Sequence, residues 1–342
     1  MPSWISRQAG DRLQAAIRSN RPPGLICLGL SAFDLVWVVD EPPGAGQKIR
    51  AHSFHEVGGG MAANASVAAA RLGASVGFWG RAGHDRAGLA MRDALAAEGV
   101  GVEQFRCFDG ASSSVSGVIV DAQGERSIVN FRGADLPTDT GWLPLDQIRH
   151  SGAVLADPRW PEGALALFRA AREAGIPTIL DGDVADAQVF DRILPLTDYA
   201  IFSAPGLNGY LPARSLRHAG AVQITADHDS INSQVAAQLH DARSTGCRLA
   251  AVTMGADGVV WLNDDGLHHL PAASVTVVDT TGAGDVFHGA FAVAIACQLE
   301  PADAFGFATV AAAIKCTHIG GRAGAPDLDT VMQFLQSLET AP

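Results

Sequence analysis

The 342-residue chain is 48% hydrophobic and 18% charged, a composition typical of globular proteins and unlike that of disordered chains. Its formal net charge of −12 argues against a nucleic-acid partner, which normally binds a basic face. Five scattered cysteines, and no apolar run long enough for a signal peptide or a membrane span, predict a reduced, cytoplasmic protein without a membrane partner.

Apolar runs and helical patterns alternate along most of the chain. Residues 1–23 form an amphipathic pattern that stops at two prolines, which predicts a helical extension ahead of one domain of residues 24–342. Apolar runs predict strands at residues 25–30, 154–156, 178–180, 199–202 and 249–253, and residues 163–174 predict a helix that ends at Gly175. This alternation predicts an α/β fold with a mostly parallel central sheet flanked by helices.

Two segments depart from this pattern, residues 45–56 and residues 111–132. Polar and apolar residues alternate in both, which predicts antiparallel strands with one face exposed to solvent. Because both segments interrupt the α/β pattern, we predict that they form a small β-sheet lid over a site in the main domain.

Residues 279–290 carry the strongest chemical signal, Asp-Thr-Thr-Gly-Ala-Gly-Asp followed by a helical pattern. They come after an apolar run at residues 275–278 that we predict to be a strand. Gly282, Ala283 and Gly284 would present free N–H groups and the positive end of a helix dipole to an anion. Asp285 would then take a proton from a hydroxyl beside that anion, so the string predicts phosphoryl transfer to an alcohol. The alternative is a glycine turn whose aspartate only favours the helix dipole.

This string resembles the C-terminal signature of the ribokinase-like (PfkB) carbohydrate kinases. The family's N-terminal signature is similar to residues 58–64, 68–73 and 80–88, and the landmarks occur in family order. The resemblance implies a ribokinase-like fold and transfer of the γ-phosphoryl group of ATP to a sugar hydroxyl, with Asp285 as the catalytic base and residues 282–284 as the anion hole. It also implies Mg²⁺ as a cofactor, and a homodimer that forms through the lid.

The resemblance further implies which residues bind the substrates. Asp34, Gly59, Gly60 and Asn64 match the residues that contact the sugar. Thr253, Gly255 and Gly258, together with Gly282 and Gly284, match the residues around the nucleotide phosphates. A hairpin turn is an additional interpretation of Gly255 and Gly258, because the strand-like residues 259–261 follow them.

The metal sites are less clear, because the family's N-x-x-E motif lacks its glutamate in the corresponding residues 202–208. Asp181 and Asp183 would organise the water shell of Mg²⁺ instead, or would cap the helix that follows them. Asp279, Thr281 and residues 315–322 match a loop that holds a monovalent cation, K⁺, mainly through backbone carbonyls. Carbonyl ligation leaves little trace in side chains, so dependence on K⁺ stays open.

Three polar residues predict an anionic sugar: Lys48, Asn130 and Arg159 fall on lid segments or at a strand end, where they would converge on one group. Taken singly, each could be a solvated surface residue. Residues 56–60, 155–157, 159–160, 180–183, 202–203, 205–207, 315–317 and 320–324 resemble the sulfofructose kinases of the family. That resemblance implies that the three residues hold the sulfonate of 6-deoxy-6-sulfofructose, which is phosphorylated at its 1-hydroxyl during sulfoquinovose breakdown. The alternatives are a kinase for a ketohexose 6-phosphate or for a neutral sugar such as fructose or ribose, and a non-catalytic sugar or nucleotide sensor.

Overall fold

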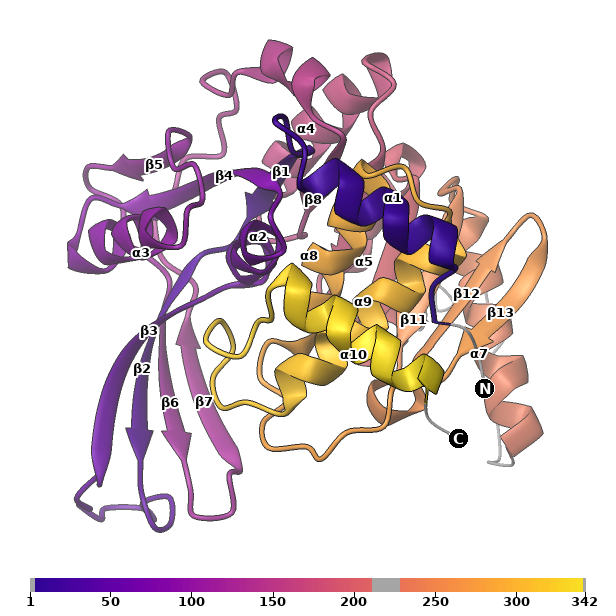
Figure 1. Cartoon of the computed structure of the whole chain (residues 1–342). Coiled ribbons are helices and arrows are strands. Elements are labelled where there is room, and N and C mark those ends of the chain that lie inside the picture. Colours follow the sequence, from indigo (N-terminus) through magenta and orange to yellow (C-terminus); the bar gives the residue numbers. More distant parts are fainter. Residues whose placement is uncertain (1–3, 211–227, 341–342) are drawn as a thin grey trace.

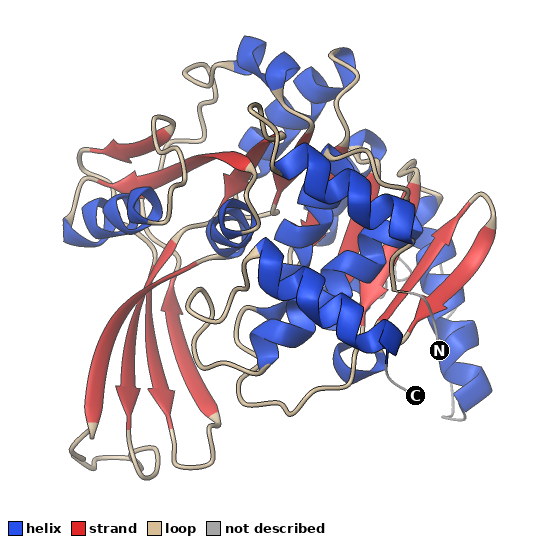
Figure 2. Cartoon of the chain, in the orientation of Figure 1, coloured by secondary structure: helices blue, strands red, loops and turns tan. Residues whose placement is uncertain are grey.

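The computed structural model describes residues 4–210 and 228–340 and shows a large sheet covered by helices, from which a smaller sheet projects (Figures 1 and 2). The large sheet has nine strands in the order β13-β12-β11-β10-β9-β8-β1-β4-β5. Neighbouring strands are parallel from β11 to β5, and β12 and β13 add an antiparallel hairpin at one edge. The predicted mostly parallel α/β fold is confirmed. The strands are β1 (Gly24–Gly29), β4 (Ser75–Gly83), β5 (Phe105–Phe108), β8 (Ala153–Ala156), β9 (Thr178–Gly182), β10 (Tyr199–Ser203), β11 (Leu249–Thr253), β12 (Val259–Asn263) and β13 (Gly266–Leu270).

Helices cover both faces of the large sheet, so successive residues of a central strand belong to two different cores. In β1, Cys27 belongs to one apolar cluster and Leu28 to the other, and both are fully buried. The first cluster includes residues of α1, α2, α3, α8, α9 and α10, and the second includes residues of α4, α5 and α7. The helices are α1 (Arg7–Ile17), α2 (Met61–Arg71), α3 (Arg86–Ala97), α4 (Pro161–Glu173), α5 (Ala187–Ile193), α7 (His228–Arg243), α8 (Ala283–Ala296), α9 (Pro301–Cys316) and α10 (Leu328–Thr340). Short 3₁₀ turns lie at Leu145–His150, Leu194–Leu196 and Gly255–Asp257.

The smaller sheet, here called the lid sheet, has the strand order β3-β2-β6-β7. Its strands are β2 (Ala32–Val38), β3 (Ser53–Gly59), β6 (Val115–Val120) and β7 (Arg126–Phe131). The sheet differs from our expectation in three respects. Strand β2 was not predicted, residues 45–52 belong to a loop ahead of β3, and β2 pairs with β6 in parallel. The parallel pair arises because both strands leave the main domain in the same direction (Figure 1).

Residues 275–278, which we predicted to be a strand, form none. Val277 and Val278 are 59% and 54% exposed, so this apolar run is not part of the buried sheet. The N–H of Val278 donates instead to the carbonyl of Cys316, at the end of α9. An apolar run alone did not distinguish a strand from a segment bound to a helix end.

Helix α1 lies within the predicted extension of residues 1–23 and packs on the main domain (Figure 1). Its Leu13 is fully buried in the cluster that also contains α8 and α9. The N–H of Ser6 donates to Asp303 of α9 at 2.6 Å. At Gly306 a side chain would overlap the backbone carbonyl of Trp4, so the two segments are in direct contact.

Candidate active site

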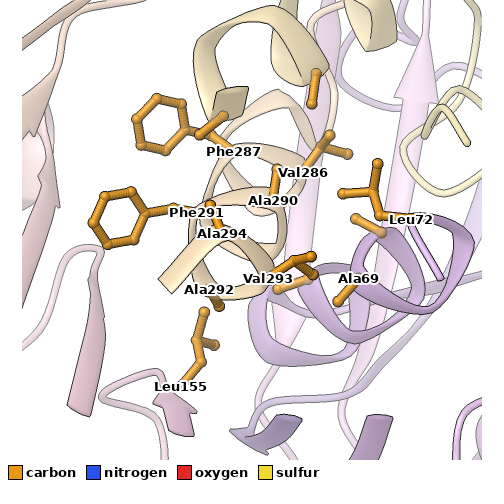
Figure 3. Packing of buried hydrophobic residues seen from close by; sticks show 14 of the residues in the cluster. Ala69, Leu72, Leu155, Val286, Phe287, Ala290, Phe291, Ala292, Val293 and Ala294 are labelled. Atoms are coloured by element: carbon orange, nitrogen blue, oxygen red, sulfur yellow. The ribbon is translucent and has the colours of Figure 1, made fainter. Parts of the chain in front are cut away.

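The first turn of α8 is built from small residues. Gly282 is its N-cap in the left-handed conformation, with φ of 71°, which glycine adopts without steric cost. Helix α8 packs closely on α2, because a side chain at Gly289 would overlap the carbonyl of Ala65. Figure 3 shows this contact, with Val293 of α8 beside Ala69 of α2. The two helix N-termini are thereby held next to each other.

Asp285 lies in this first turn and accepts a hydrogen bond from Nδ2 of Asn64, on α2, at 2.6 Å. Burial raises its pKa to about 7, the charge of Asp181 adds to the rise, and the bond from Asn64 opposes it. Beneath it, the buried ring of His288 lies between the carbonyl oxygens of Gly284, at 2.7 Å, and Ile201, at 3.1 Å. Asp285 is therefore a carboxylate held by Asn64 of α2, with a pKa suited to proton transfer near neutral pH.

Two cavities meet at this turn. One, of about 790 Å³ and here called the acceptor cavity, is lined by Asp285 and by residues of the lid sheet and the sheet edge. The other, of about 480 Å³ and here called the nucleotide cavity, is lined by Ala283 and Gly284. The predicted nucleotide residues Thr253, Gly255 and Gly258 line the nucleotide cavity as well. The predicted sugar contacts Asp34 and Gly60, together with Asn130, Arg159 and Asp183, line the acceptor cavity.

The lid sheet forms one wall of the acceptor cavity through a row of polar residues on three adjacent strands. Asp34 of β2 is opposite Ser116 of β6, which is opposite Asn130 of β7. Nδ2 of Asn130 donates to Oγ of Ser116 at 3.1 Å. Burial raises the pKa of Asp34, while Ser116 and the positive charge of Arg322 oppose the rise. Gly59 of β3, which is opposite Ala32, has no room for a side chain because one would overlap the carboxylate of Asp34.

Two arginines that sequence reasoning missed line the acceptor cavity together with Arg159. The guanidinium of Arg81 stacks 4.4 Å from the centre of the Trp160 ring, and burial lowers its pKa to about 10. Arg132 follows Asn130 by two residues, and Ile128, Asn130 and Arg132 all line the cavity. Since alternate residues of a strand lie on the same face, the spacing of two from Asn130 could have predicted that Arg132 lines the cavity. Nη2 of Arg159 is 3.1 Å from Asp183, so its charge is partly balanced.

The structure places Lys48 away from the other predicted sugar residues. It lies in the exposed loop between β2 and β3 and does not line the acceptor cavity. The loop stands at the outer end of the lid sheet (Figure 1), whereas Asp34 and Asn130 are nearer the main domain. Gly59 and Asn64 do not line the acceptor cavity either, but they lie against Asp34 and Asp285.

A further residue that the sequence did not single out, Arg322, supports Asn64. Its Nε donates to Oδ1 of Asn64 at 2.8 Å, and its Nη2 donates to the carbonyl of Gly59 at 3.0 Å. Because Oδ1 is engaged, the amide of Asn64 directs its Nδ2 toward Asp285. A side chain at Gly58 would overlap this guanidinium. Arg322 therefore connects the end of β3 to Asn64, the residue that contacts the carboxylate of Asp285.

The predicted metal residues lie in two places. Asp181 is buried behind Asp285, its Oδ2 has no hydrogen-bond partner, and burial raises its pKa well above the usual value. Asp183 faces the acceptor cavity and accepts hydrogen bonds from Arg159 and Ser203. Within residues 4–210 and 228–340, no three acidic, histidine or cysteine side chains form a group that could hold a metal ion.

Asp279 and Thr281 form the loop that precedes α8. Oδ1 of Asp279 accepts hydrogen bonds from the N–H and the hydroxyl of Thr281, and Oδ2 accepts one from the N–H of Gly320. Two cations contact this loop: the ammonium of Lys315 donates to the carbonyl of Asp279 at 2.6 Å, and the guanidinium of Arg126 donates to the hydroxyl of Thr281.

Comparison with known proteins shows the family to which the chain belongs. The sequence model described as pfkB family carbohydrate kinase matches residues 23–328. The chain is 30% identical to a ribokinase of Bacillus subtilis, with 91% of this chain and 99% of that protein aligned. It is also 30% identical to an aminoimidazole riboside kinase of Salmonella typhimurium, over 90% of this chain and 97% of that protein. The structure of Arabidopsis thaliana ribokinase complexed with ribose and ATP superposes with a TM-score of 0.78 at 25% identity, over 92% of this chain and 99% of that one.

None of the helices in the described parts of the chain has the length and apolar character that crossing a membrane requires. The match to the family model extends over most of the chain and includes both cavities and the first turn of α8. The chain belongs to the pfkB family, and it is an ATP-dependent carbohydrate kinase with the ribokinase-like fold.

Proposed function

We propose that Asp285 is the general base of this kinase and that the sugar hydroxyl is phosphorylated where the two cavities meet. The observation that carries the proposal is the placement of consecutive residues on opposite sides of one helical turn. Asp285 lines the acceptor cavity, whereas Ala283 and Gly284 line the nucleotide cavity. A hydroxyl beside Asp285 would thus lie next to a phosphate beside residues 283–284, as in-line transfer requires.

Different residues have different roles in this phosphoryl transfer. Asn64 holds Oδ2 of Asp285, which leaves Oδ1 to accept the proton of the sugar hydroxyl. The N–H groups at the start of α8 are directed at the phosphate and stabilise the charge that develops on its oxygens. Thr253, Gly255 and Gly258 would contact the nucleotide, and Asp34 would fix the sugar through its hydroxyls.

Two carboxylates fit Mg²⁺ bound to the nucleotide phosphates, those of the buried Asp181 and of Asp183. Oδ2 of Asp181 is buried without a hydrogen-bond partner, 3.5 Å from Nδ1 of His288, and Asp183 faces the acceptor cavity. Since Mg²⁺ usually keeps several waters and is bound by one or two carboxylates plus phosphates, these two residues would hold it through water. The ion neutralises phosphate charge when it is bound.

We further propose that the acceptor is anionic at one end, with 6-deoxy-6-sulfofructose as the substrate and its 1-phosphate as the product. Support comes from Arg81, Arg132, Arg159 and Asn130, four donor side chains that line the same cavity as the base. Guanidinium groups match the oxygens of a sulfonate. A ketohexose 6-phosphate offers a similar anion and is the main alternative. The printed names of the relatives, ribokinase above all, favour a neutral pentose as the second candidate.

One assay separates these acceptors. Purified enzyme with ATP and Mg²⁺ would be given sulfofructose, fructose 6-phosphate, fructose and ribose, and kcat/KM would be measured for each. Since charge-assisted hydrogen bonds each contribute about 1.5–3 kcal/mol, we expect sulfofructose to exceed fructose by at least roughly tenfold. Preference for fructose 6-phosphate would support the alternative, and preference for ribose or fructose would refute an anionic acceptor. No turnover of any sugar would leave only a sensor.

A homodimer formed through the lid sheet belongs to the same proposal. The sheet's two outer strands, β3 and β7, have unpaired edges, and Val129, Ile128 and Phe54 are 79%, 60% and 48% exposed. A second copy would cover these side chains. Lys48 could then contribute to a sulfonate site only if the pairing carries its loop to another copy's cavity. Light scattering of the intact protein and of Val129→Glu measures the oligomeric state, and a dimer formed through the lid sheet should be weakened in the variant. A monomeric wild type would exclude the dimer.

A further inference from the structure

The inference concerns Lys315, one of only two lysines in the chain. Lys315 is at the end of α9, and its side chain is completely buried. A buried ammonium is unfavourable unless its charge and its three N–H groups find partners. Its Nζ is 2.6 Å from the carbonyl oxygen of Asp279, 3.4 Å from that of His318 and 3.9 Å from Oδ2 of Asp279. The chain has therefore built an oxygen-lined site around a cation of its own.

The oxygens around Lys315 come from the segments that we predicted to hold K⁺. Asp279 precedes the phosphate-binding turn of α8, and His318 follows α9. The two segments are connected by further hydrogen bonds, from the N–H groups of Val278 and Asp279 to the carbonyl of Cys316 at 2.8 and 3.1 Å. Oxygen atoms of both segments thus surround one point, and the ammonium of Lys315 occupies it.

A potassium ion does not fit this oxygen-lined site. An ammonium 2.6 Å from the Asp279 carbonyl already occupies the position in which an ion would share that oxygen. Two cations in contact would also repel each other strongly in a site with little water. Arg126, on β7, adds more positive charge, because it donates to Thr281 and lies 3.8 Å from Oδ1 of Asp279. The single carboxylate of Asp279 therefore already faces two cationic side chains.

The electrostatics agree with a charged lysine at this position. Burial raises the pKa of Asp279, but bonds from Thr281 and Gly320 and the charge of Lys315 outweigh it and lower the pKa overall. Asp279 is thus ionised and stabilises the ammonium. Burial lowers the pKa of Lys315, and the charge of Asp279 opposes that shift.

We propose that Lys315 is a tethered internal cation that takes the place of K⁺ beneath the phosphate-binding turn, so that the kinase works without a monovalent metal ion. The ammonium fixes the carbonyl of Asp279 and with it the loop that leads through Thr280 into Ala283, both of which line the nucleotide cavity. A covalently attached cation also loses no freedom on binding, so the loop would stay ordered whatever the ionic composition. The inference rests on the kinase activity and not on the identity of the acceptor.

The test compares cations at constant ionic strength. Initial rates of the full-length enzyme, with ATP, Mg²⁺ and the best acceptor of the panel above, would be measured in choline, sodium and potassium chloride. We expect the wild-type rates to agree within about twofold, because no metal ion adds a charge that the site lacks. A rise of more than about threefold on replacing choline by potassium would overturn the proposal.

Lys315→Ala sharpens the test, because it removes the ammonium and leaves the oxygens. In choline its kcat/KM for ATP should fall by about ten- to a hundredfold, the value of one charge-assisted hydrogen bond. Potassium or ammonium chloride should restore most of this loss. If potassium does not restore the activity that Lys315→Ala loses, Lys315 does not occupy a cation site. The same conclusion would follow if Lys315→Ala were as active as wild type in choline. Arg149→Ala, which removes an exposed cation far from this loop in the sequence, is the matched control and should respond to no salt.

A second measurement does not depend on turnover. If Lys315→Ala binds potassium in the folded state, its thermal midpoint should rise with potassium relative to choline, whereas that of wild type should not. If Lys315→Ala fails to fold in any salt, the wild-type comparison in choline and potassium still decides the proposal. Folding of Lys315→Ala in potassium but not in choline would support it.

Discussion

The two cavities that meet at α8 are built in different ways. The nucleotide cavity is lined by residues between Thr253 and Cys316, many of them glycine, alanine or other small residues. The acceptor cavity is lined by residues from Gly29 to Asp285, and arginine and aspartate side chains come to it from several elements. A site made of backbone groups requires small residues in sequence and leaves a motif, whereas a site made of side chains is assembled by the fold. The family of such an enzyme is therefore easy to recognise from its sequence, whereas its substrate is hard to assign.

The largest expected effect is at the shared turn. Asp285→Asn should lower kcat by about 10²- to 10⁴-fold, because it removes positioned proton transfer and keeps the shape. The affinity for ATP, measured by calorimetry, should stay nearly unchanged because the nucleotide cavity is lined by other residues. A variant that keeps more than about a tenth of the wild-type kcat would exclude Asp285 as the base.

The next effect belongs to the acceptor cavity alone. Arg159→Ala should lower kcat/KM for sulfofructose by about ten- to more than a hundredfold. The loss has two causes, since Asp183, now without its partner at 3.1 Å, would also repel the sulfonate. Arg81→Ala should act in the same direction, and fructose, which has no anion, is the internal control. Arg159 does not recognise the anion if the ratio of the two sugars' kcat/KM values equals that of wild type.

A smaller effect is expected at Arg322, which holds the amide of Asn64. Arg322→Ala frees the amide of Asn64 to rotate, so we expect kcat to fall by roughly tenfold, the value of a charge-assisted hydrogen bond. KM for ATP should change little. If Arg322 acts through Asn64, its removal should cost much less in the Asn64→Ala background than in wild type. Additive losses would contradict this route and would leave Arg322 with a role in the fold.

The mildest perturbation is pH. The pKa of Asp285 is raised to about 7, and a base must be unprotonated, so kcat/KM should rise with pH up to about 7 and then level off. Burial and the charge of Asp181 favour the protonated form, while Asn64 and His288 favour the ionised one. Asn64→Ala should therefore move the midpoint upward. A profile of kcat/KM that is flat between pH 5 and 8, about three pH units around this pKa, would show that the rate does not depend on the ionisation of Asp285.

The sequence alone predicted the parts that depend on consecutive residues. The turn at residues 282–285, the mostly parallel sheet and the hairpin turn at Gly255 and Gly258 are all present in the structure. Arg81 and Arg322 were missed because each is defined by partners far along the chain, Trp160 for one and Asn64 for the other. Lys48 is a complementary case, since its charge suited the substrate but its loop lies at the outer end of the lid sheet. Dependence on K⁺ at the loop around Lys315 stayed open, because carbonyl ligands leave little trace in side chains.

The contact between Trp4 and Gly306 has a practical consequence for anyone who trims this protein. The family match begins at residue 23, and an expression clone cut at that boundary would look complete. Yet such a cut would strip Ile5, Leu13 and Ile17 from the apolar surface on which they are buried. The uncovered strip would lie over α9 and α10, where Trp4 approaches Gly306 and Gly10 approaches Met332, and a shortened protein would be prone to aggregate before its kinetics could be measured. The hydrophobic core therefore extends to residues on the N-terminal side of the boundary of the family match.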